Sequence, residues 1–130
     1  MKKKSNRYVD GFVFVVPKKN IAKYRAMAKK GGQLWMKYGA LEYIECQGDD
    51  IRPNMGGHKT LLFPQLVKLK PNETVWFSFI VYKSKQHRNQ VNAKVMTDPW
   101  MQTDQAQKTM PFDAKRMSYG GFKVVVDLSK

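Results

Sequence analysis

Asp10 is the acidic side chain whose surroundings most need an explanation. It interrupts an apolar segment, residues 8–16, which reads Tyr-Val-Asp-Gly-Phe-Val-Phe-Val-Val. A carboxylate that is buried without a partner strongly destabilises a fold. We therefore expect Asp10 either to act as an acid–base group that faces a cavity or to form a structural pair with Arg116, Lys123 or a backbone amide. The sequence leaves both alternatives open.

The two sides of this strand differ in the size of their side chains. Successive residues of a strand point to opposite faces of its sheet. The side that carries Asp10 has large side chains, those of Tyr8, Phe12 and Phe14. The other side has small or branched residues, namely Val9, Gly11 and Val13. We expect the small side to pack under the helices, and Asp10 to face the lumen of a barrel.

The two histidines are the other acid–base candidates. His87 falls in the first turns of a predicted helix, where a packing or surface role competes with catalysis, which would require a carboxylate or water within reach. His58 lies in a glycine-rich loop and is a weaker candidate, a residue of a lid. The side chains that we expect to line a ligand pocket beside Asp10 are Tyr8, Trp76, Ser78, Asn92, Met96 and Tyr119. For the aromatic members, packing in the core is the competing interpretation.

The number of cysteines and the spacing of possible metal ligands limit which kinds of site the chain can form. Cys46 is the single cysteine, so an intrachain disulfide is excluded, and we expect Cys46 to be an inert core residue. The sequence lacks the spacing of a zinc site, a glycine-rich phosphate loop and a nucleophile elbow. We expect neither a metal nor a cofactor.

The elements that must position these residues follow from hydrophobic periodicity. Strands are predicted at residues 8–16, 40–47, 73–82 and 116–128, with a short one within 61–69, and helices at 20–38 and from Ser84 to the break at Asp98-Pro99. The pair Gly31-Gly32 predicts a kink or a close helix-to-sheet approach, and Gly120-Gly121 predicts a bulge. Residues 101–108 are predicted to form a short helix or a lid.

This order is the β-α-β-β-α-β pattern of a ferredoxin-like α+β fold, in which helices cover one face of an antiparallel sheet. Residues 8–16 and 73–82 are apolar on both sides, and a single domain of 130 residues has little chain left to cover the second face. We expect a second copy to cover it, which gives a dimeric α+β barrel. Phe14 is expected in that interface, so Phe14→Asp should disrupt the dimer. Residues 1–6 are expected to be an extended or disordered basic N-terminus.

Composition bounds the class of protein. Hydrophobic residues make up 42% of the chain, which suffices for a core, and an apolar run long enough for a membrane span is absent. The segment at the N-terminus lacks a cleavage site, so we expect a cytoplasmic protein. The formal charge of +14 is compatible with a solvated basic surface or with a polyanionic partner such as nucleic acid.

Short segments in order along the chain carry a resemblance. They include Tyr-Val-Asp-Gly-Phe (8–12), Tyr-Gly-Ala-Leu-Glu-Tyr (38–43), Val-Tyr-Lys-Ser (81–84), Val-Asn-Ala-Lys-Val-Met (91–96), Met-Pro-Phe-Asp (110–113) and Lys-Arg-Met-Ser-Tyr-Gly-Gly-Phe (115–122). Together they resemble the YbaA-like family of bacterial proteins of unknown function. The resemblance implies the dimeric α+β-barrel superfamily, and it implies neither an activity nor catalytic residues. The chain departs from the family in its basicity and in a longer connection at residues 53–59.

Two functional hypotheses follow, and whether the protein is an enzyme stays open. The first is a homodimer that binds or transforms a small, partly aromatic or carbonyl-bearing molecule in a cavity near the sheet; superfamily analogy suggests cofactor-independent monooxygenase or isomerase chemistry, a weak warrant. The enzyme interpretation fails if Asp10 is salt-bridged with no cavity beside it. The alternative is a polyanion or nucleic-acid binding module. A small stress-response accessory protein without a ligand is a third possibility.

Overall fold

The structure is a computed structural model that describes residues 6–54, 56–57, 59–103 and 110–129. His58 and most of the predicted lid at residues 101–108 lie outside the described residues, as does nearly all of the predicted basic N-terminus. Within the described part, the bounds of the main strands and helices agree closely with the hydrophobic periodicity.

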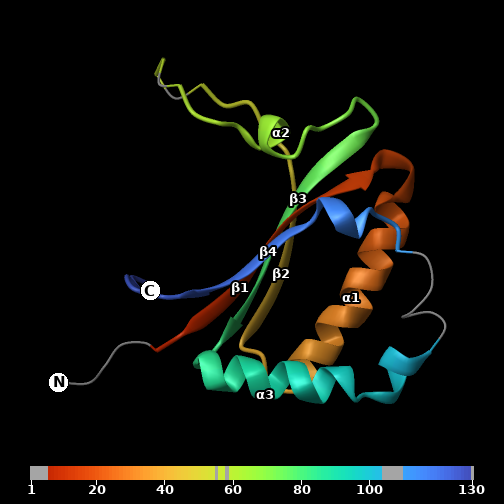
Figure 1. Cartoon of the computed structure of the whole chain (residues 1–130), viewed down its shortest axis with the longest axis vertical. Helices are drawn as coiled ribbons and strands as arrows, with labels where there is room; N and C mark the ends of the chain where they lie inside the picture. Colours follow the sequence, from red (N-terminus) through yellow and green to blue (C-terminus); the bar gives the residue numbers. More distant parts are fainter. Residues whose placement is uncertain (1–5, 55, 58, 104–109, 130) are drawn as a thin grey trace.

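Four strands form one sheet: β1 (Tyr8–Pro17), β2 (Glu42–Gln47), β3 (Glu73–Tyr82) and β4 (Ser118–Lys123). Their order across the sheet is β2-β3-β1-β4, and the paired strands are all antiparallel. Helices α1 (Ile21–Lys37) and α3 (Lys85–Met96) pack on one side of the sheet (Figure 1). This confirms the predicted α+β fold of ferredoxin-like topology.

Local sequence signals explain where the helices begin and end. The Ser84 side chain accepts a hydrogen bond from the backbone N–H of His87 at 3.0 Å and so caps α3. Gly39 follows α1 with a φ of +113°, a conformation that favours glycine at a helix end. Short 3₁₀ helices η1 (Lys18–Asn20), η2 (Pro99–Gln102) and η3 (Ala114–Arg116) complete the helical elements described.

The core lies between the sheet and the helices. One cluster contains Phe14, Tyr24, Ala28, Trp76 and Phe112, and a second contains Leu34, Ala40, Ile80, Tyr82, Val91 and Val95. Phe14 is fully buried, so the large side of β1, and not the small side, faces the helices. Our prediction for the orientation of β1, and with it the placement of Phe14 in a subunit interface, was wrong.

The reason lies on α1, which presents small residues to the sheet. Ala28 and Gly32 are buried there, and a Cβ added to Gly32 would lie 2.6 Å from Cδ1 of Tyr43. At these two positions the helix leaves room for large side chains from the strands, whereas Tyr24, also buried on α1, packs on Phe14 with ring centroids 5.2 Å apart. The predicted close approach of helix and sheet at Gly31-Gly32 is confirmed at Gly32.

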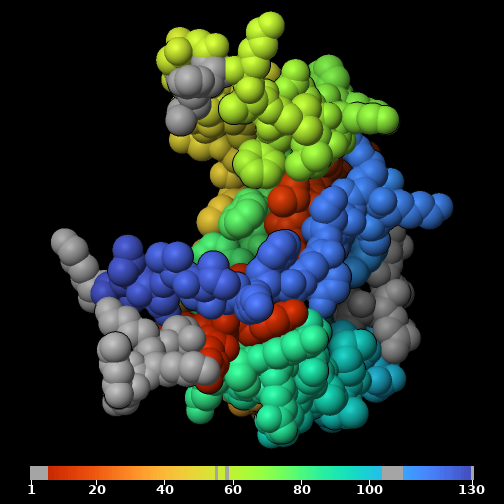
Figure 2. All heavy atoms as spheres, turned by 60° about the vertical axis from the view of Figure 1, so that its left-hand side comes forward, coloured from red at the N-terminus to blue at the C-terminus, as the bar shows by residue number. Residues whose placement is uncertain are grey.

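The opposite face of the sheet carries apolar side chains that neither α1 nor α3 covers. Register places Val9, Val13, Phe77 and Phe79 on this face, and the exposed fractions of Phe77 and Phe122 are 45% and 63%. Figure 2 turns toward this side, where the C-terminal segment runs across the molecule and the segment around α2 (Phe63–Leu66) rises above it.

Three further predictions were wrong. The short strand expected within residues 61–69 is instead the single helical turn α2. Pro64 is its second residue, a position near a helix start that tolerates proline. The Gln65 side chain caps this start by accepting a hydrogen bond from the Leu62 N–H at 3.0 Å. The bulge expected at Gly120-Gly121 is absent from β4, because its register with β1 runs without interruption. Gly121 is required for another reason: a Cβ there would lie 2.5 Å from the hydroxyl of Tyr8. The strand also ends at Lys123, earlier than predicted.

Candidate functional site

Asp10 is paired by a residue that the sequence did not indicate. Its carboxylate is 1% exposed, and Oδ1 lies 3.4 Å from Nε of Arg88 on α3. Arg88 also donates from Nη2 to the hydroxyl of Tyr8 at 3.2 Å and stacks over the Tyr8 ring at 4.9 Å. Arg116, which we had expected as a partner, binds Glu73 at 2.6 Å instead.

Burial and the pairing with Arg88 act in opposite directions on the pKa of Asp10. Burial raises the pKa of the Asp10 carboxyl, and Arg88, Asn92 and Tyr82 partly offset the shift. Asn92 in turn accepts hydrogen bonds at Oδ1 from Trp35 Nε1 and the Tyr82 hydroxyl, at 3.0 and 3.1 Å. The result is a polar cluster that joins α1 and α3 to the sheet. None of the three cavities described below includes Asp10 in its lining, so the geometry favours the structural alternative.

The remaining predicted site residues are not gathered into one site. Nδ1 of His87 accepts from the Lys83 N–H at 3.0 Å, and burial, with Lys83 and Lys94 nearby, lowers its pKa. Met96 is 56% exposed, and Tyr119 stacks on Phe12 with ring centroids 4.8 Å apart. The catalytic role expected of His87 and the pocket roles expected of Met96, Tyr119 and Asn92 stay predictions.

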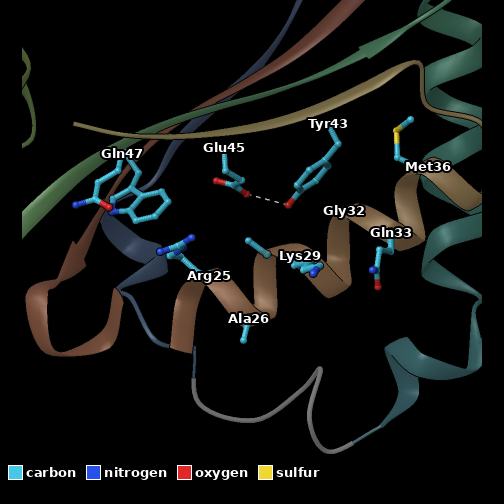
Figure 3. Close-up of a pocket in the computed structure, with 11 residues that line it drawn as sticks. Arg25, Ala26, Lys29, Gly32, Gln33, Met36, Tyr43, Glu45 and Gln47 are labelled. Carbon is cyan, nitrogen blue, oxygen red and sulfur yellow. Dashed lines mark hydrogen bonds between the residues drawn. The ribbon is translucent and has the colours of Figure 1, made fainter. Parts of the chain in front are cut away.

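The largest cavity described lies between α1 and the edge strand β2, and its volume is about 870 Å³. Figure 3 shows Tyr43 and Glu45 pointing from β2 toward α1, where Arg25 and Lys29 lie. Trp76, one of the predicted pocket residues, contributes to its wall together with Gly32 and Met36. Ser78, another predicted pocket residue, pairs with Glu45 in the register of β2 and β3.

Glu45 is the polar centre of this cavity. Its Oε2 accepts hydrogen bonds from the hydroxyls of Tyr24 and Tyr43, at 2.8 and 2.9 Å. Its Oε1 is buried and has no hydrogen-bond partner in the described part of the chain. Burial raises the pKa of the Glu45 carboxyl, although both tyrosines and Ser78 act in the opposite direction. Burial and the Glu45 charge raise the pKa values of both tyrosines, so they remain hydrogen-bond donors at neutral pH.

We did not predict Glu45 as a site residue, although the sequence contained a signal. Alternation along residues 41–46 places Glu45 on the same side of the strand as Tyr43. A carboxylate on the side of an aromatic residue is the same pattern that singled out Asp10. What the strand pattern lacked was the contribution of Tyr24, which comes from α1.

Metal binding has no support among the described residues. They contain no group of three or more His, Cys, Asp or Glu side chains that could hold a metal ion.

Cys46 is exposed, contrary to our prediction of a core residue, and borders a second cavity of about 420 Å³ next to Phe63 and Phe77. A third cavity of about 380 Å³ has Lys18, Arg52 and Glu73 in its walls. Among the helices described, none has the length and apolarity required to cross a membrane.

Comparison with known proteins places this architecture in a family. The profile of the family described as "Protein of unknown function (DUF1428)" matches residues 7–114. The chain belongs to the DUF1428 family. The match includes both Asp10 and Glu45 and all three of β1, β2 and β3.

Individual relatives extend the match to nearly the whole chain. The sequence is 43% identical over 121 residues to the uncharacterized protein YbaA of Escherichia coli strain K12, covering 93% of this chain and 98% of the relative. It is similar to the same extent to the uncharacterized protein YbaA of Shigella flexneri. The expected membership of a YbaA-like bacterial family is therefore confirmed.

Proposed function

We propose that this DUF1428 protein binds a small organic molecule in the cavity between α1 and β2. The observation that carries the proposal is the Glu45 carboxylate, which lines an otherwise largely apolar cavity with one buried oxygen unpaired. Leaving a buried acceptor without a partner costs about 1–3 kcal/mol. Asp10 Oδ1 and Arg88 Nε share this state among the described residues, and what distinguishes Glu45 from them is the cavity that it lines. A volume of about 870 Å³ lies within the range typical of ligand pockets.

A single substitution on α1 tests whether fragments bind in this cavity. Met36 lines it and points toward β2 (Figure 3), whereas Lys30, an exposed residue of the same helix, does not line it. We expect Met36→Trp to abolish the thermal shifts that small fragments produce in a library screen, and Lys30→Trp to leave them unchanged. Shifts that persist in Met36→Trp would show that the fragments bind elsewhere, and a screen without any shift would contradict the proposal.

We also propose that the protein is a homodimer in which the second copy covers the open face of the sheet. Phe77 and Phe122 are largely exposed on that face, and Val9, Val13 and Phe79 share it. Burying apolar surface is worth roughly 25 cal/mol per Å², and contiguous exposed apolar patches on soluble proteins mark interfaces. This arrangement would leave the α1–β2 cavity in each subunit on the opposite side of the sheet from the interface.

Binding of single-stranded nucleic acid is the competing function for the open face. Phe77 and Phe79 stand at alternate positions of the central strand β3, a placement that lets bases stack, and the chain carries a formal charge of +14. Titration of mixed single-stranded DNA and RNA between about 50 and 200 mM salt separates the two functions, because phosphate contacts make affinity fall steeply with salt. A flat response excludes this function, whereas a steep one with a monomeric protein excludes the homodimer.

A further inference from the structure

We propose that residues 124–129 of each copy of the chain dock on the other copy in the dimer. The side chains of Val126 and Leu128 enter the cavity of about 420 Å³ that Phe63 and Phe77 border. This inference rests on the proposed homodimer and adds the contact by which the two copies hold each other.

Segment 124–129 has the pattern of a strand but is not part of one in the structure. Alternation places Val124, Val126 and Leu128 on one side and Val125, Asp127 and Ser129 on the other. Such alternation is typical of a half-buried strand. The strand β4 ends at Lys123, although the Val124 N–H still donates to the Arg7 carbonyl at 3.0 Å. The segment therefore has an apolar side that nothing in its own subunit buries.

The exposure of this segment confirms that it lacks a packing partner within the subunit. Val125, Val126 and Leu128 have exposed fractions of 79%, 74% and 87%, which are larger than those of the other large hydrophobic residues described. Figure 1 shows the segment leaving the sheet on the side opposite to α1 and α3. A contiguous apolar stretch that stands away from its own subunit marks a contact with another molecule.

The cavity that receives the segment lies on the same open face of the sheet. Cys46 is directly opposite Phe77 in the register of β2 and β3, so both side chains are on this face. The connection around α2 supplies further apolar walls, those of Ile51, Leu61, Leu62 and Phe63. Phe63 and Phe77 are each 45% exposed, so aliphatic side chains that enter here bury apolar surface on both partners.

The positions of the segment and the cavity fit a two-fold axis. The segment begins beside the Tyr82 end of β3, because Lys123 and Tyr82 both pair with Tyr8. The cavity lies at the other end of β3, beside Val75. A two-fold axis that packs the open faces together with their strands in opposite directions brings each segment to the cavity of the other copy. The same contact then forms twice in one dimer.

The charges around the two surfaces are complementary. Asp49 and Asp50 line the cavity, are exposed and take part in none of the ion pairs of the described residues. Lys123 and Lys130 flank the segment in the sequence. Complementary charges steer association and fix its register, so two copies that both carry a charge of +14 still have one favourable way to meet.

Cross-linking with a short bis-maleimide tests the contact directly. Cys46 is the single cysteine and lines the cavity, so Leu128→Cys should give a covalent dimer on a denaturing gel. Lys30→Cys adds an exposed thiol on α1 and should not. Removing the native thiol from the Leu128→Cys protein by Cys46→Ser should abolish the covalent dimer. A dimer that persists, or a link within one chain, would overturn the exchange.

Charged substitutions test whether the contact holds the dimer. Val126→Asp combined with Leu128→Asp should raise the dissociation constant about 100-fold or more in analytical ultracentrifugation. Val125→Asp, on the other side of the segment, is the control and should leave it unchanged. All three side chains are exposed in one subunit, so circular dichroism should show folded variants. A monomeric wild type would overturn the homodimer and this inference together, whereas an equally tight dimer of the double variant would overturn the exchange alone.

Discussion

The neighbouring glycines of α1 should respond in opposite directions to the same substitution. A Cβ on Gly32 would lie 2.6 Å from Cδ1 of Tyr43, whereas a Cβ on Gly31 meets only the Tyr43 hydroxyl at 3.9 Å. In a helix interior, replacing glycine by alanine gains about 1 kcal/mol. At Gly32 this gain is opposed by overpacking, which costs about 1–3 kcal/mol, and the displaced Tyr43 ring carries a hydrogen bond to Glu45.

We therefore expect Gly31→Ala to raise the free energy of unfolding by about 0.5–1 kcal/mol and Gly32→Ala to lower it by about 1–2 kcal/mol. The assay is urea denaturation of both variants and the wild type at one protein concentration, since the midpoint of a dimer depends on concentration. Equal m-values would show that the shifts in midpoint report stability. A Gly32→Ala variant as stable as Gly31→Ala would refute the close approach of α1 to β2.

Three further perturbations test the rest of the structure. Arg88→Met leaves Asp10 buried without its counter-charge and should cost about 3 kcal/mol in urea denaturation, whereas adding Asp10→Asn should restore part of the loss; no recovery would contradict the pairing. Burial raises the pKa of Glu45 above 4.5, so the wild type should lose stability as pH rises from about 4.5 through the raised pKa, and Glu45→Gln should not show this loss. The measurement is the difference in free energy of unfolding between the wild type and Glu45→Gln as a function of pH. A difference that does not change with pH would contradict a raised pKa of Glu45. Phe77→Asp should convert a dimer into a folded monomer of 15.1 kDa in light scattering, whereas Phe14→Asp should unfold the chain; a Phe77→Asp dimer would place the interface elsewhere.

Local patterns were sufficient to predict most of the elements. The bounds of β3 and the cap of α3 at Ser84 agree with the structure, because alternation and capping depend on neighbouring residues. The side of β1 that faces the helices could not be predicted in the same way, since both sides are apolar. The missing information was how α1 packs, because Ala28 and Gly32 leave space for strand side chains and Tyr24 stacks on Phe14.

The site required contacts between distant parts of the chain. Arg88 and Tyr24 come from helices, and the pattern of a strand cannot indicate which helical side chain will reach its carboxylate. A structural pair was one of the two alternatives for Asp10, and the partner is Arg88 and not one of the residues expected, for this reason. Glu45 was not predicted as a site residue; it lies on β2, a strand at the edge of the sheet, and its two hydrogen-bond donors are Tyr43 of the same strand and Tyr24 of α1.

Both tyrosines donate to the same oxygen of Glu45, and this makes the carboxyl group unsymmetrical. A carboxylate oxygen has two lone pairs, so Oε2 is saturated and any proton taken up by the group must reside on Oε1. On protonation, Oε1, which is buried, changes from an acceptor into a donor while the tyrosines stay in place. The same side chain therefore requires a donor beside Oε1 above its raised pKa and an acceptor there below it.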